Sequence, residues 1–313
     1  MFIEQAFKGD NALWKFIVTT FLCTGLFIAN LIFFLVFDDI DTAAETQKML
    51  EIFPKNVFLA MNLAVFIPIL GLLFLLVWAV HKRSILSLTT SRSKVDFKRI
   101  GFSFLLIFIF TVGSFIISYA LTPEDYVLQF DAFNFIMLLI VSLIFFPFQI
   151  GLEEYLFRGY LMQQVGVLAR NRWFPLLLTS VMFGVFHWAN PEVAELGPII
   201  MIFYIGTGLL LGIMTLMDEG LELALGFHFG NNFLAATLVT MEYAALQTDA
   251  LYVSTAEEGS SLEIILPVLI IYPIFLLILA KKYKWSGWKE KIFGKIKLPA
   301  QEGNDMIEGS QSL

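Results

Sequence analysis

Long apolar segments separated by short polar connections dominate this chain. Eight such segments can be marked, and each is bounded by charged or turn-forming residues. A helix of about 20 apolar residues is long enough to cross a bilayer. The pattern therefore predicts an all-α, polytopic membrane helical bundle with about eight transmembrane helices, at residues 14–37, 57–80, 100–121, 133–150, 174–189, 197–217, 223–240 and 262–280.

The fourth apolar region is too long for one straight span. Helix-compatible sequence continues from Ala132 to about Ala169, and Pro147 and Gly151 offer a place for a break. No linker divides the chain, so we expect a single transmembrane domain over residues 1–285, with the chemical motifs below inside 133–240.

The remaining residues, 286–313, are expected to form a cytoplasmic tail. Apolar residues recur in it at near-helical spacing among lysines, which is typical of an interfacial helix, but a disordered tail fits equally well. The last residues, from Glu302 to Leu313, are expected to be disordered.

Lysine and arginine are concentrated in alternate connections. The loop from Lys82 to Arg99 and the turn near Arg170 are basic, whereas the connections between them are acidic. Because cytoplasmic loops are enriched in Lys and Arg, both termini and the basic loops should be cytoplasmic. One short turn disagrees, since it carries Asp218, Glu219 and Glu222 and must face the cytoplasm if the count of eight is right.

Composition narrows the classes of function. The chain is 58% hydrophobic and 15% charged, which effectively excludes a soluble enzyme. Its net charge of −7 gives no sign of nucleic-acid binding. The single cysteine, Cys23, excludes an intramolecular disulfide and a cysteine-based metal cluster. The only binding partner that the composition indicates is the lipid bilayer. The composition does not indicate an oligomeric state.

Charged residues at membrane depth are costly and are therefore functional candidates. In the sequence GLEEYLFRGYL, Glu154 and Arg158 stand four residues apart, so they lie one above the other on a helix and can form an ion pair. Glu153 is rotated about 100° away and stays free for chemistry. On its own, this cluster could equally be a solvated helix end.

Two of the three histidines lie inside apolar segments. They are His187, in FGVFHW, and His228, which shares a helix face with Asn232 four residues later. A lone histidine in an apolar helix is more often a packing residue, but two of them together favour a site. His81 abuts Lys82 and Arg83, so it is expected to be a solvated flank without a role.

Gly226 and Gly230 flank His228 at G-x-x-x-G spacing, which allows another helix or a peptide backbone to come close. If the chain turns between Arg170 and Trp173, Glu153 and His187 lie at nearly equal distances from that turn. An antiparallel hairpin then brings the carboxylate and the imidazole to one level.

This set of residues can hydrolyse a peptide bond. Glu153 would act as general base with His187 sharing the water, and His228 and Asn232 would donate hydrogen bonds to the oxyanion. Alternatively, Glu153, His187 and His228 could hold one divalent metal ion such as zinc. The motif H-E-x-x-H is absent, so spacing itself does not argue for zinc.

The order E-E-x-x-x-R, F-x-x-x-H and H-x-x-x-N, each on its own apolar segment, resembles the CPBP family of membrane proteases. This family comprises type II CAAX prenyl endopeptidases and bacterial relatives that include bacteriocin-processing and immunity proteins. The motifs read Glu153, Glu154, Arg158, Phe183, His187, His228 and Asn232 here. The resemblance implies eight helices, cleavage on the cytoplasmic side and the roles given above, by a glutamate or a metal-dependent mechanism.

The sequence therefore predicts an intramembrane endopeptidase in the cell membrane, expected to be a bacterial cytoplasmic membrane, acting on a membrane-associated or C-terminal peptide. Two other classes of function stay open. One is a non-catalytic immunity or scaffold protein in which the polar residues hold helices together. The other is a proton-coupled transporter in which Glu153 and His187 form a relay.

Overall fold

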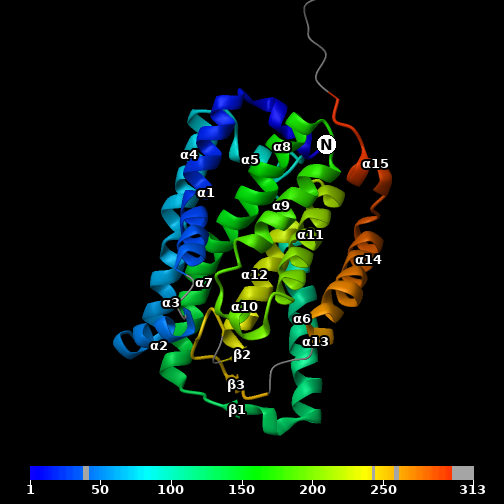
Figure 1. The fold of residues 1–313 in the computed structure, drawn as a ribbon. Coiled ribbons are helices and arrows are strands. Elements are labelled where there is room, and N and C mark those ends of the chain that lie inside the picture. The colour runs from blue at the N-terminus through cyan, green and yellow to red at the C-terminus, as the bar shows by residue number, and fades with distance from the viewer. Residues whose placement is uncertain (38–41, 242–243, 257–260, 298–313) are drawn as a thin grey trace, which may run out of the picture.

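The protein is an elongated bundle of helices, shown in the computed structural model of Figure 1. The structure describes residues 1–37, 42–241, 244–256 and 261–297. The helices are η1 (Ile3–Lys8), α1 (Leu13–Val36), α2 (Thr42–Ile52), α3 (Lys55–Ala64), α4 (Phe66–Ala79), α5 (Ile85–Thr89), α6 (Phe97–Leu121), η2 (Pro123–Asp125), α7 (Ala132–Glu154), η3 (Tyr155–Leu161), α8 (Met162–Ala169), α9 (Trp173–Val185), α10 (Pro191–Leu196), α11 (Ile200–Asp218), α12 (Glu222–Thr237), α13 (Ser261–Leu266), η4 (Pro267–Ile271), α14 (Tyr272–Tyr283) and α15 (Trp288–Phe293).

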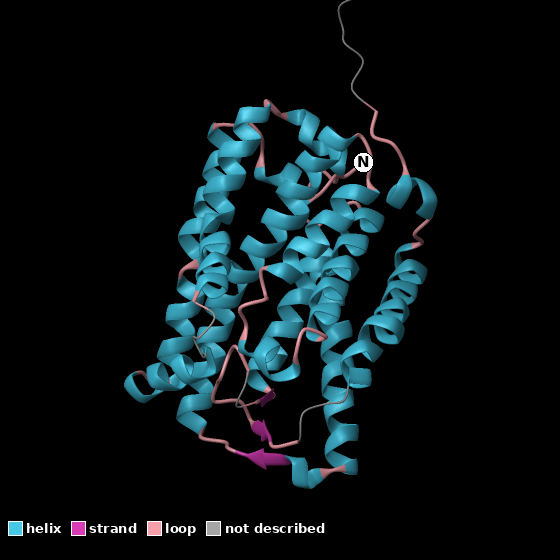
Figure 2. Ribbon diagram, in the orientation of Figure 1, coloured by secondary structure: helices cyan, strands magenta, loops and turns pink. Residues whose placement is uncertain are grey.

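Three short strands form the only sheet in the described part of the chain, at one end of the bundle (Figure 2). They are β1 (Tyr126–Leu128), β2 (Val239–Thr240) and β3 (Tyr252–Ser254), in the order β1-β3-β2. β3 runs antiparallel to β1 and parallel to β2. The fold is thus nearly all-α, as the apolar pattern predicts.

Six helical segments of the described chain are long and apolar enough to cross a membrane: Leu13–Val36, Lys55–Ala79, Phe97–Leu121, Ala132–Ala169, Ile200–Asp218 and Ile264–Tyr283. The protein is therefore a multi-pass membrane protein. The two other predicted spans correspond to α9 and α12, which have 13 and 16 residues. Both are shorter than the roughly 20 residues of a full crossing, so the count of eight stays a prediction.

The long fourth segment has no break at Pro147 or Gly151, and that expectation is wrong. α7 continues through Pro147, and the irregularity comes later, in the π-helix η3. Gly151 serves packing instead, because an added Cβ would lie 3.1 Å from Leu70 of α4. π-Helical turns are frequently found at functional sites, and this one follows Glu154 directly.

The connections gather at two opposite ends of the bundle. η1, α5, the turn between α8 and α9, and α15 lie at one end, and the three strands lie at the other (Figure 1). We call the first the basic end, because it carries the Lys82 to Arg99 loop. Both described ends of the chain lie next to the turn between α8 and α9. Near the first end, Glu4 forms an ion pair with Arg172, and near the last, the Ile296 amide donates a hydrogen bond to the Arg170 carbonyl. Which side of the membrane the basic end faces stays a prediction.

The acidic turn that disagrees with the charge rule is neutralised at the basic end. Asp218 forms ion pairs with Arg92 at 2.8 Å and Arg99 at 2.5 Å, and it accepts a hydrogen bond from Trp285. Glu222, which is fully buried, pairs with Arg92 at 3.1 Å. The carboxylates of this turn therefore hold the basic loop in place rather than opposing it.

The described part of the tail ends in α15, which packs on the bundle. Ile292 and Ile296 are buried in a cluster with Ile3 of η1 and Met217 of α11. Lys291 donates a hydrogen bond to the Met217 carbonyl at 2.7 Å. The expected disorder of Glu302 to Leu313 lies outside the described residues.

His81 is buried, so the expectation of a solvated flank is wrong. Its Nδ1 donates to the Asp10 carbonyl at 2.8 Å, and its Nε2 lies 3.2 Å from Thr19 and 3.0 Å from Tyr160. The segment between η1 and α1 folds over this position and covers it. Burial lowers the pKa of His81, so its ring is neutral at physiological pH.

The two glycines of the G-x-x-x-G spacing in α12 allow α6 to pack closely against α12, and this confirms the predicted close approach of another helix. An added Cβ at Gly226 would collide with the Ile100 carbonyl, and one at Gly230 would collide with Ile107. This close approach fixes α12, and with it His228, against its neighbour.

Candidate functional site

The polar residues predicted from the three motifs are carried by neighbouring elements in the interior of the bundle. Glu153 and Glu154 end α7, Arg158 lies in η3, His187 follows α9, and His228 and Asn232 lie on α12. α12 packs on α7, and η3 packs on α9. Three segments that are distant in the sequence thus meet at one level.

Glu154 and Arg158 form the ion pair that their spacing predicts. Arg158 Nη1 lies 2.8 Å from Glu154 Oε1, and both side chains are fully buried. Arg158 also donates from Nη2 to the Gly208 carbonyl of α11 at 3.3 Å. Two fully buried charges persist in a membrane protein only when they are paired in this way.

His228 connects the two glutamates. Its Nδ1 lies 2.8 Å from Glu154 Oε1, and its Nε2 lies 3.6 Å from Glu153 Oε2. Because the Glu154 carboxylate accepts, Nδ1 of His228 is the donor, and Nε2 is the ring nitrogen that faces Glu153. The imidazole therefore has a carboxylate on each side.

Charge balance sets the number of protons in this cluster. Two carboxylates and one guanidinium leave a net charge of −1, which is costly to bury. One additional proton, on Nε2 of His228 or on the unpartnered carboxylate oxygen of Glu153 or Glu154, would make the cluster neutral. Of these atoms, Nε2 of His228 and Oε2 of Glu153 lie 3.6 Å apart.

Glu153 is the carboxylate of the cluster that is not paired with Arg158. It is 4% exposed, and its Oε1 accepts a hydrogen bond from Gln149 at 3.2 Å. Its Oε2 is buried and has no hydrogen-bond partner. Such an atom is able to bind and deprotonate a water molecule.

The imidazole in direct contact with Glu153 is that of His228, whereas the sequence predicts that His187 shares a water molecule with Glu153. No hydrogen bond or ion pair joins Glu153 to His187 among the described residues, whereas Glu153 lies within 3.6 Å of His228. The reason is local. α9 ends at Val185, and the following turn directs His187 Nδ1 back to the Phe183 carbonyl at 2.6 Å. Counting residues from the turn near Arg170 predicted similar depths for Glu153 and His187, but it could not give the direction of their side chains.

The same hydrogen bond defines the state of the His187 ring. A carbonyl oxygen can only accept, so Nδ1 of His187 carries a proton and Nε2 of the neutral ring has a free lone pair. The ring of Tyr204 stacks on this imidazole, with centroids 4.6 Å apart and an interplanar angle of 24°. Asn190 donates to the Tyr204 hydroxyl at 3.2 Å.

Phe183, the aromatic residue of the F-x-x-x-H motif, lies at the centre of the site. Its ring centroid is 4.6 Å from that of His187 and 5.8 Å from that of His228. The Arg158 guanidinium carbon lies 4.4 Å from the same centroid, in a cation–π contact. One buried ring therefore fixes both histidines and the arginine relative to each other.

Asn232 is oriented by its neighbour. Asn231 donates from Nδ2 to the Asn232 carbonyl oxygen at 3.2 Å. This bond directs Asn232 to use its own NH₂ group as a donor, which is the group that an oxyanion requires. Asn232 lies one helical turn beyond His228 on the same face of α12.

The arrangement does not fit the alternative of a metal held by Glu153, His187 and His228. No group of three or more His, Cys, Asp or Glu side chains in the described chain is placed to hold a metal ion. His228 uses one nitrogen for Glu154, and the ring of Phe183 is in contact with both imidazoles. Glu153, His187 and His228 would have to move before they could share one ion.

Several supporting residues were not predicted as site residues. Gln149 stands four residues before Glu153, so the rule that paired Glu154 with Arg158 could have found it. Asn231 directly precedes Asn232, but no sequence pattern indicates that its side chain binds that of Asn232. Tyr204 and Gly208 come from α11, and no local pattern indicates that they reach this site.

An all-helical, multi-pass membrane protein with a buried Glu/Arg/His cluster is the class that fold and site define. Residues 132–234 match the family described as type II CAAX prenyl endopeptidase Rce1-like. This match confirms the resemblance seen in the motifs, and the matched segment contains all of the predicted site residues.

The chain is also similar to a bacterial protein over most of its length. It is 28% identical over 246 residues to the uncharacterized protein YyaK of Bacillus subtilis strain 168, which covers 74% of this chain and 80% of YyaK. No solved structure gave a significant match.

Proposed function

We propose that this protein is an intramembrane endopeptidase that hydrolyses a peptide bond with a water molecule activated by Glu153. The observation that carries the proposal is the free Oε2 atom of Glu153, which is buried, has no hydrogen-bond partner and lies 3.6 Å from His228 Nε2. Oε2 of Glu154 also lacks a hydrogen-bond partner, but that carboxylate is neutralised by Arg158, whereas the only ion-pair partner of Glu153 among the described residues is His228. The Rce1-like match of residues 132–234 supports the same reaction.

In the first step, Glu153 takes a proton from water while the water oxygen forms a bond to the carbonyl carbon of the substrate. The free Nε2 of His187 accepts a hydrogen bond from the same water and orients it. The carbonyl oxygen becomes negative, and the Asn232 amide donates to it. His228, when it carries the extra proton of the cluster, is a second donor from Nε2.

In the second step, the bond between the carbonyl carbon and the peptide nitrogen breaks. Glu153 gives its proton to the leaving nitrogen, so the carboxylate is regenerated and the products are a carboxylic acid and an amine. Glu154 and Arg158 do not touch the reacting atoms. Glu154 positions His228 through the bond from Nδ1, and Arg158 neutralises the charge of Glu154.

The substrate is proposed to be a membrane-associated or C-terminal peptide that reaches the bundle from the cytoplasmic side of a bacterial cytoplasmic membrane. The cytoplasmic side is supported by the lysines and arginines that gather at the basic end. The family's description names a CAAX motif, which stands at the C-terminus of a protein, and this supports a C-terminal peptide as the substrate.

The test is Glu153→Gln in protein reconstituted in liposomes with a library of membrane-anchored peptides. Glutamine preserves the shape and the bond from Gln149 but cannot act as a base, so cleavage should fall by about 10²–10⁴ while the melting temperature is kept. Glu124→Gln, a carboxylate in the turn before β1, is the matched control and should cleave like the wild type.

Other outcomes would assign a different function. If Glu153→Gln leaves cleavage or the cellular phenotype intact with unchanged stability, the protein is a scaffold and the proposal fails. If the variant loses proton-coupled solute flux in the same liposomes, it is a transporter. A chelator at concentrations that preserve the fold should have little effect, whereas loss of cleavage that metal restores would require a metal mechanism.

A further inference from the structure

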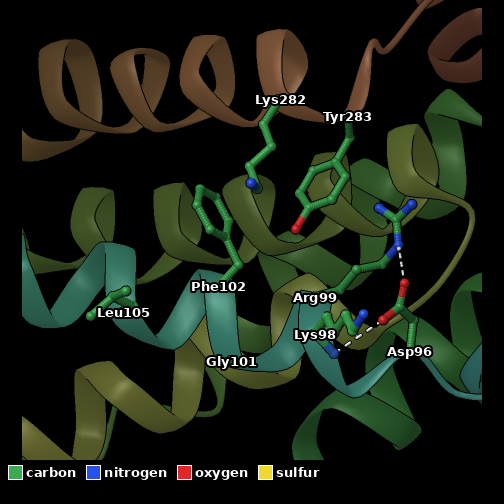
Figure 3. Close-up of a pocket in the computed structure, with 8 residues that line it drawn as sticks. All are labelled: Asp96, Lys98, Arg99, Gly101, Phe102, Leu105, Lys282 and Tyr283. Carbon is green, nitrogen blue, oxygen red and sulfur yellow. Dashed lines mark hydrogen bonds and ion pairs between the residues drawn. The ribbon is translucent and has the colours of Figure 1, made fainter.

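A groove separates α6 and α14 at the basic end, far along the chain from the motifs (Figure 3). Its volume is about 530 Å³. Its lining consists of Asp96, Lys98, Arg99, Gly101, Phe102, Leu105, Lys282 and Tyr283. Nothing in the proposed proteolysis uses these residues.

The groove lies at the level where two membrane spans end. α6 begins at Phe97 as the spanning segment Phe97–Leu121, and α14 closes the spanning segment Ile264–Tyr283. The first residues of one span therefore meet the last residues of the other. A groove in this place opens where the headgroups of the surrounding lipid lie.

The only carboxylate among the residues that line the groove, that of Asp96, already binds other groups of the protein. Asp96 caps α6 by accepting from the Lys98 amide at 3.0 Å, and it pairs with Arg99 Nε at 3.2 Å (Figure 3). Arg99 is held again by Asp218 at 2.5 Å. The aspartate and the arginine thus belong to an ion-pair network that extends to Asp218 in the neighbouring turn.

Two exposed lysines supply the net charge of the groove. Neither Lys98 nor Lys282 has a carboxylate partner among the described residues. The Lys282 ammonium lies 4.3 Å from the Phe102 ring centroid, which holds it over the groove (Figure 3). The groove therefore presents two positive charges and the Tyr283 hydroxyl, a hydrogen-bond donor, to whatever enters.

The groove continues into apolar surface on the membrane side. Leu105, at its inner end, is 50% exposed, and Ile109 one turn further is 62% exposed. Ile278 lies one turn before Lys282 on the same face of α14 and is also exposed. A ligand that satisfies both regions has an anionic head and an apolar chain.

We propose that this groove binds the phosphate headgroup of an anionic phospholipid in the leaflet at the basic end. The two lysines and the Tyr283 hydroxyl donate to the phosphate oxygens, and one acyl chain lies against Leu105 and Ile109. A bound lipid of this kind would bridge α6 and α14. It would therefore stabilise the helix that packs on Gly226 and Gly230 of α12.

The acidic C-terminal segment is the competing occupant. Residues after 300 include Glu302, Asp305 and Glu308. A peptide, however, would leave the exposed apolar surface below the lysines uncovered, whereas an acyl chain covers it. This is the reason for choosing the lipid, and the experiment includes a truncated chain.

The experiment compares lipid binding in detergent by native mass spectrometry and by the shift in melting temperature. Phosphatidylglycerol is the anionic probe, and phosphatidylcholine and inorganic phosphate are the controls. The test variant is Lys98→Gln with Lys282→Gln. The matched control is Lys94→Gln with Lys281→Gln, which removes the same charge from two exposed lysines at the same end that do not line the groove.

Phosphatidylglycerol should bind the wild type and the control pair and raise their melting temperatures, and it should bind the test pair about 30-fold more weakly. Each lysine near an anionic headgroup contributes about 1 kcal/mol, and two correspond to this factor. Phosphatidylcholine should have little effect on any of the proteins.

Three results would overturn the proposal. If both variant pairs lose binding equally, the attraction belongs to the whole basic end and not to the groove. If inorganic phosphate at millimolar concentration gives the same shift, the site is for a free anion. If phosphatidylglycerol acts only after residues 300–313 are removed, the tail is the occupant. Because none of these measurements involves cleavage, the result is independent of the proposed proteolysis.

Discussion

His228 places its Nε2 atom 3.6 Å from the free Oε2 atom of Glu153. The opposite nitrogen of the same ring is bonded to Glu154, which in turn is paired with Arg158. Four residues from two segments thus share one buried charge network. The network makes the position of Glu153 depend on residues that do not touch a substrate.

The buried ion pair should be necessary for stability. Arg158→Met leaves the fully buried Glu154 without its cation, and removing one partner of such a pair costs about 3–5 kcal/mol. The melting temperature in detergent should fall by about 10 °C, at about 2–4 °C per kcal/mol. Glu154→Gln combined with Arg158→Met removes both charges and should recover most of the loss. A double variant no more stable than Arg158→Met would show that the arginine acts through packing on Phe183.

Part of this site could be predicted from local periodicity. The i, i+4 relation gave the Glu154–Arg158 pair, and counting residues from the turn at Arg170 brought Glu153 and His187 to one level. Side-chain direction could not be obtained in this way, because the direction of His187 follows from where α9 ends and from its bond to Phe183.

The errors concern contacts between residues that are far apart in the sequence. His81 appears solvated beside two cationic neighbours, yet its partners Thr19 and Tyr160 come from 62 positions before it and 79 after it. The prediction of a helix break at Pro147 was wrong. A proline removes only one backbone hydrogen-bond donor, and the other hydrogen bonds of α7 keep the helix continuous.

Topology can be tested with single cysteines at the two ends. The native Cys23 is fully buried, so it gives little background. Glu124→Cys, before β1, should react with a membrane-impermeant maleimide in intact cells. Lys94→Cys, in the basic loop, should react only after the membrane is opened, because lysine and arginine are retained in the cytoplasm. Labelling of Lys94→Cys alone in intact cells would reverse the proposed orientation.

Glu192 should make stability depend on pH. Burial raises its pKa above the ordinary value of 4.5, and the bond that its Oε1 accepts from the Ala245 amide at 2.8 Å opposes this shift. A raised carboxyl pKa means that the folded state prefers the protonated form. This contribution to stability is therefore complete below about pH 4.5 and is lost as the pH rises through the pKa of the folded state.

Glu192→Gln mimics the protonated form and preserves the acceptor for Ala245. Its melting temperature should be at or above that of the wild type at pH 8, and the difference should shrink towards pH 4. Thermal unfolding in detergent between pH 4 and pH 8 measures both curves. A glutamine variant that is less stable than the wild type by the same amount at every pH would contradict the assignment.

Tyr204 is expected to act as a positioning residue for His187, because its ring stacks on the imidazole at 4.6 Å. Tyr204→Leu removes the stack, and since such aromatic pairs contribute about 0.5–1.5 kcal/mol, kcat should fall about 2- to 10-fold. Tyr204→Phe preserves the ring and loses only the hydroxyl that accepts from Asn190, so it should restore most of the activity.

The pH profile of cleavage distinguishes positioning from a general loss of stability. Tyr204→Leu changes the surroundings of the His187 ring, so the profile of kcat/KM should shift in this variant and stay in place in Tyr204→Phe. Tyr119→Leu, an aromatic residue of α6 near the strands, is the control and should alter neither kcat nor the profile. If leucine and phenylalanine at position 204 behave alike, the stacked ring does not position His187, and that histidine is held by its bond to the Phe183 carbonyl alone.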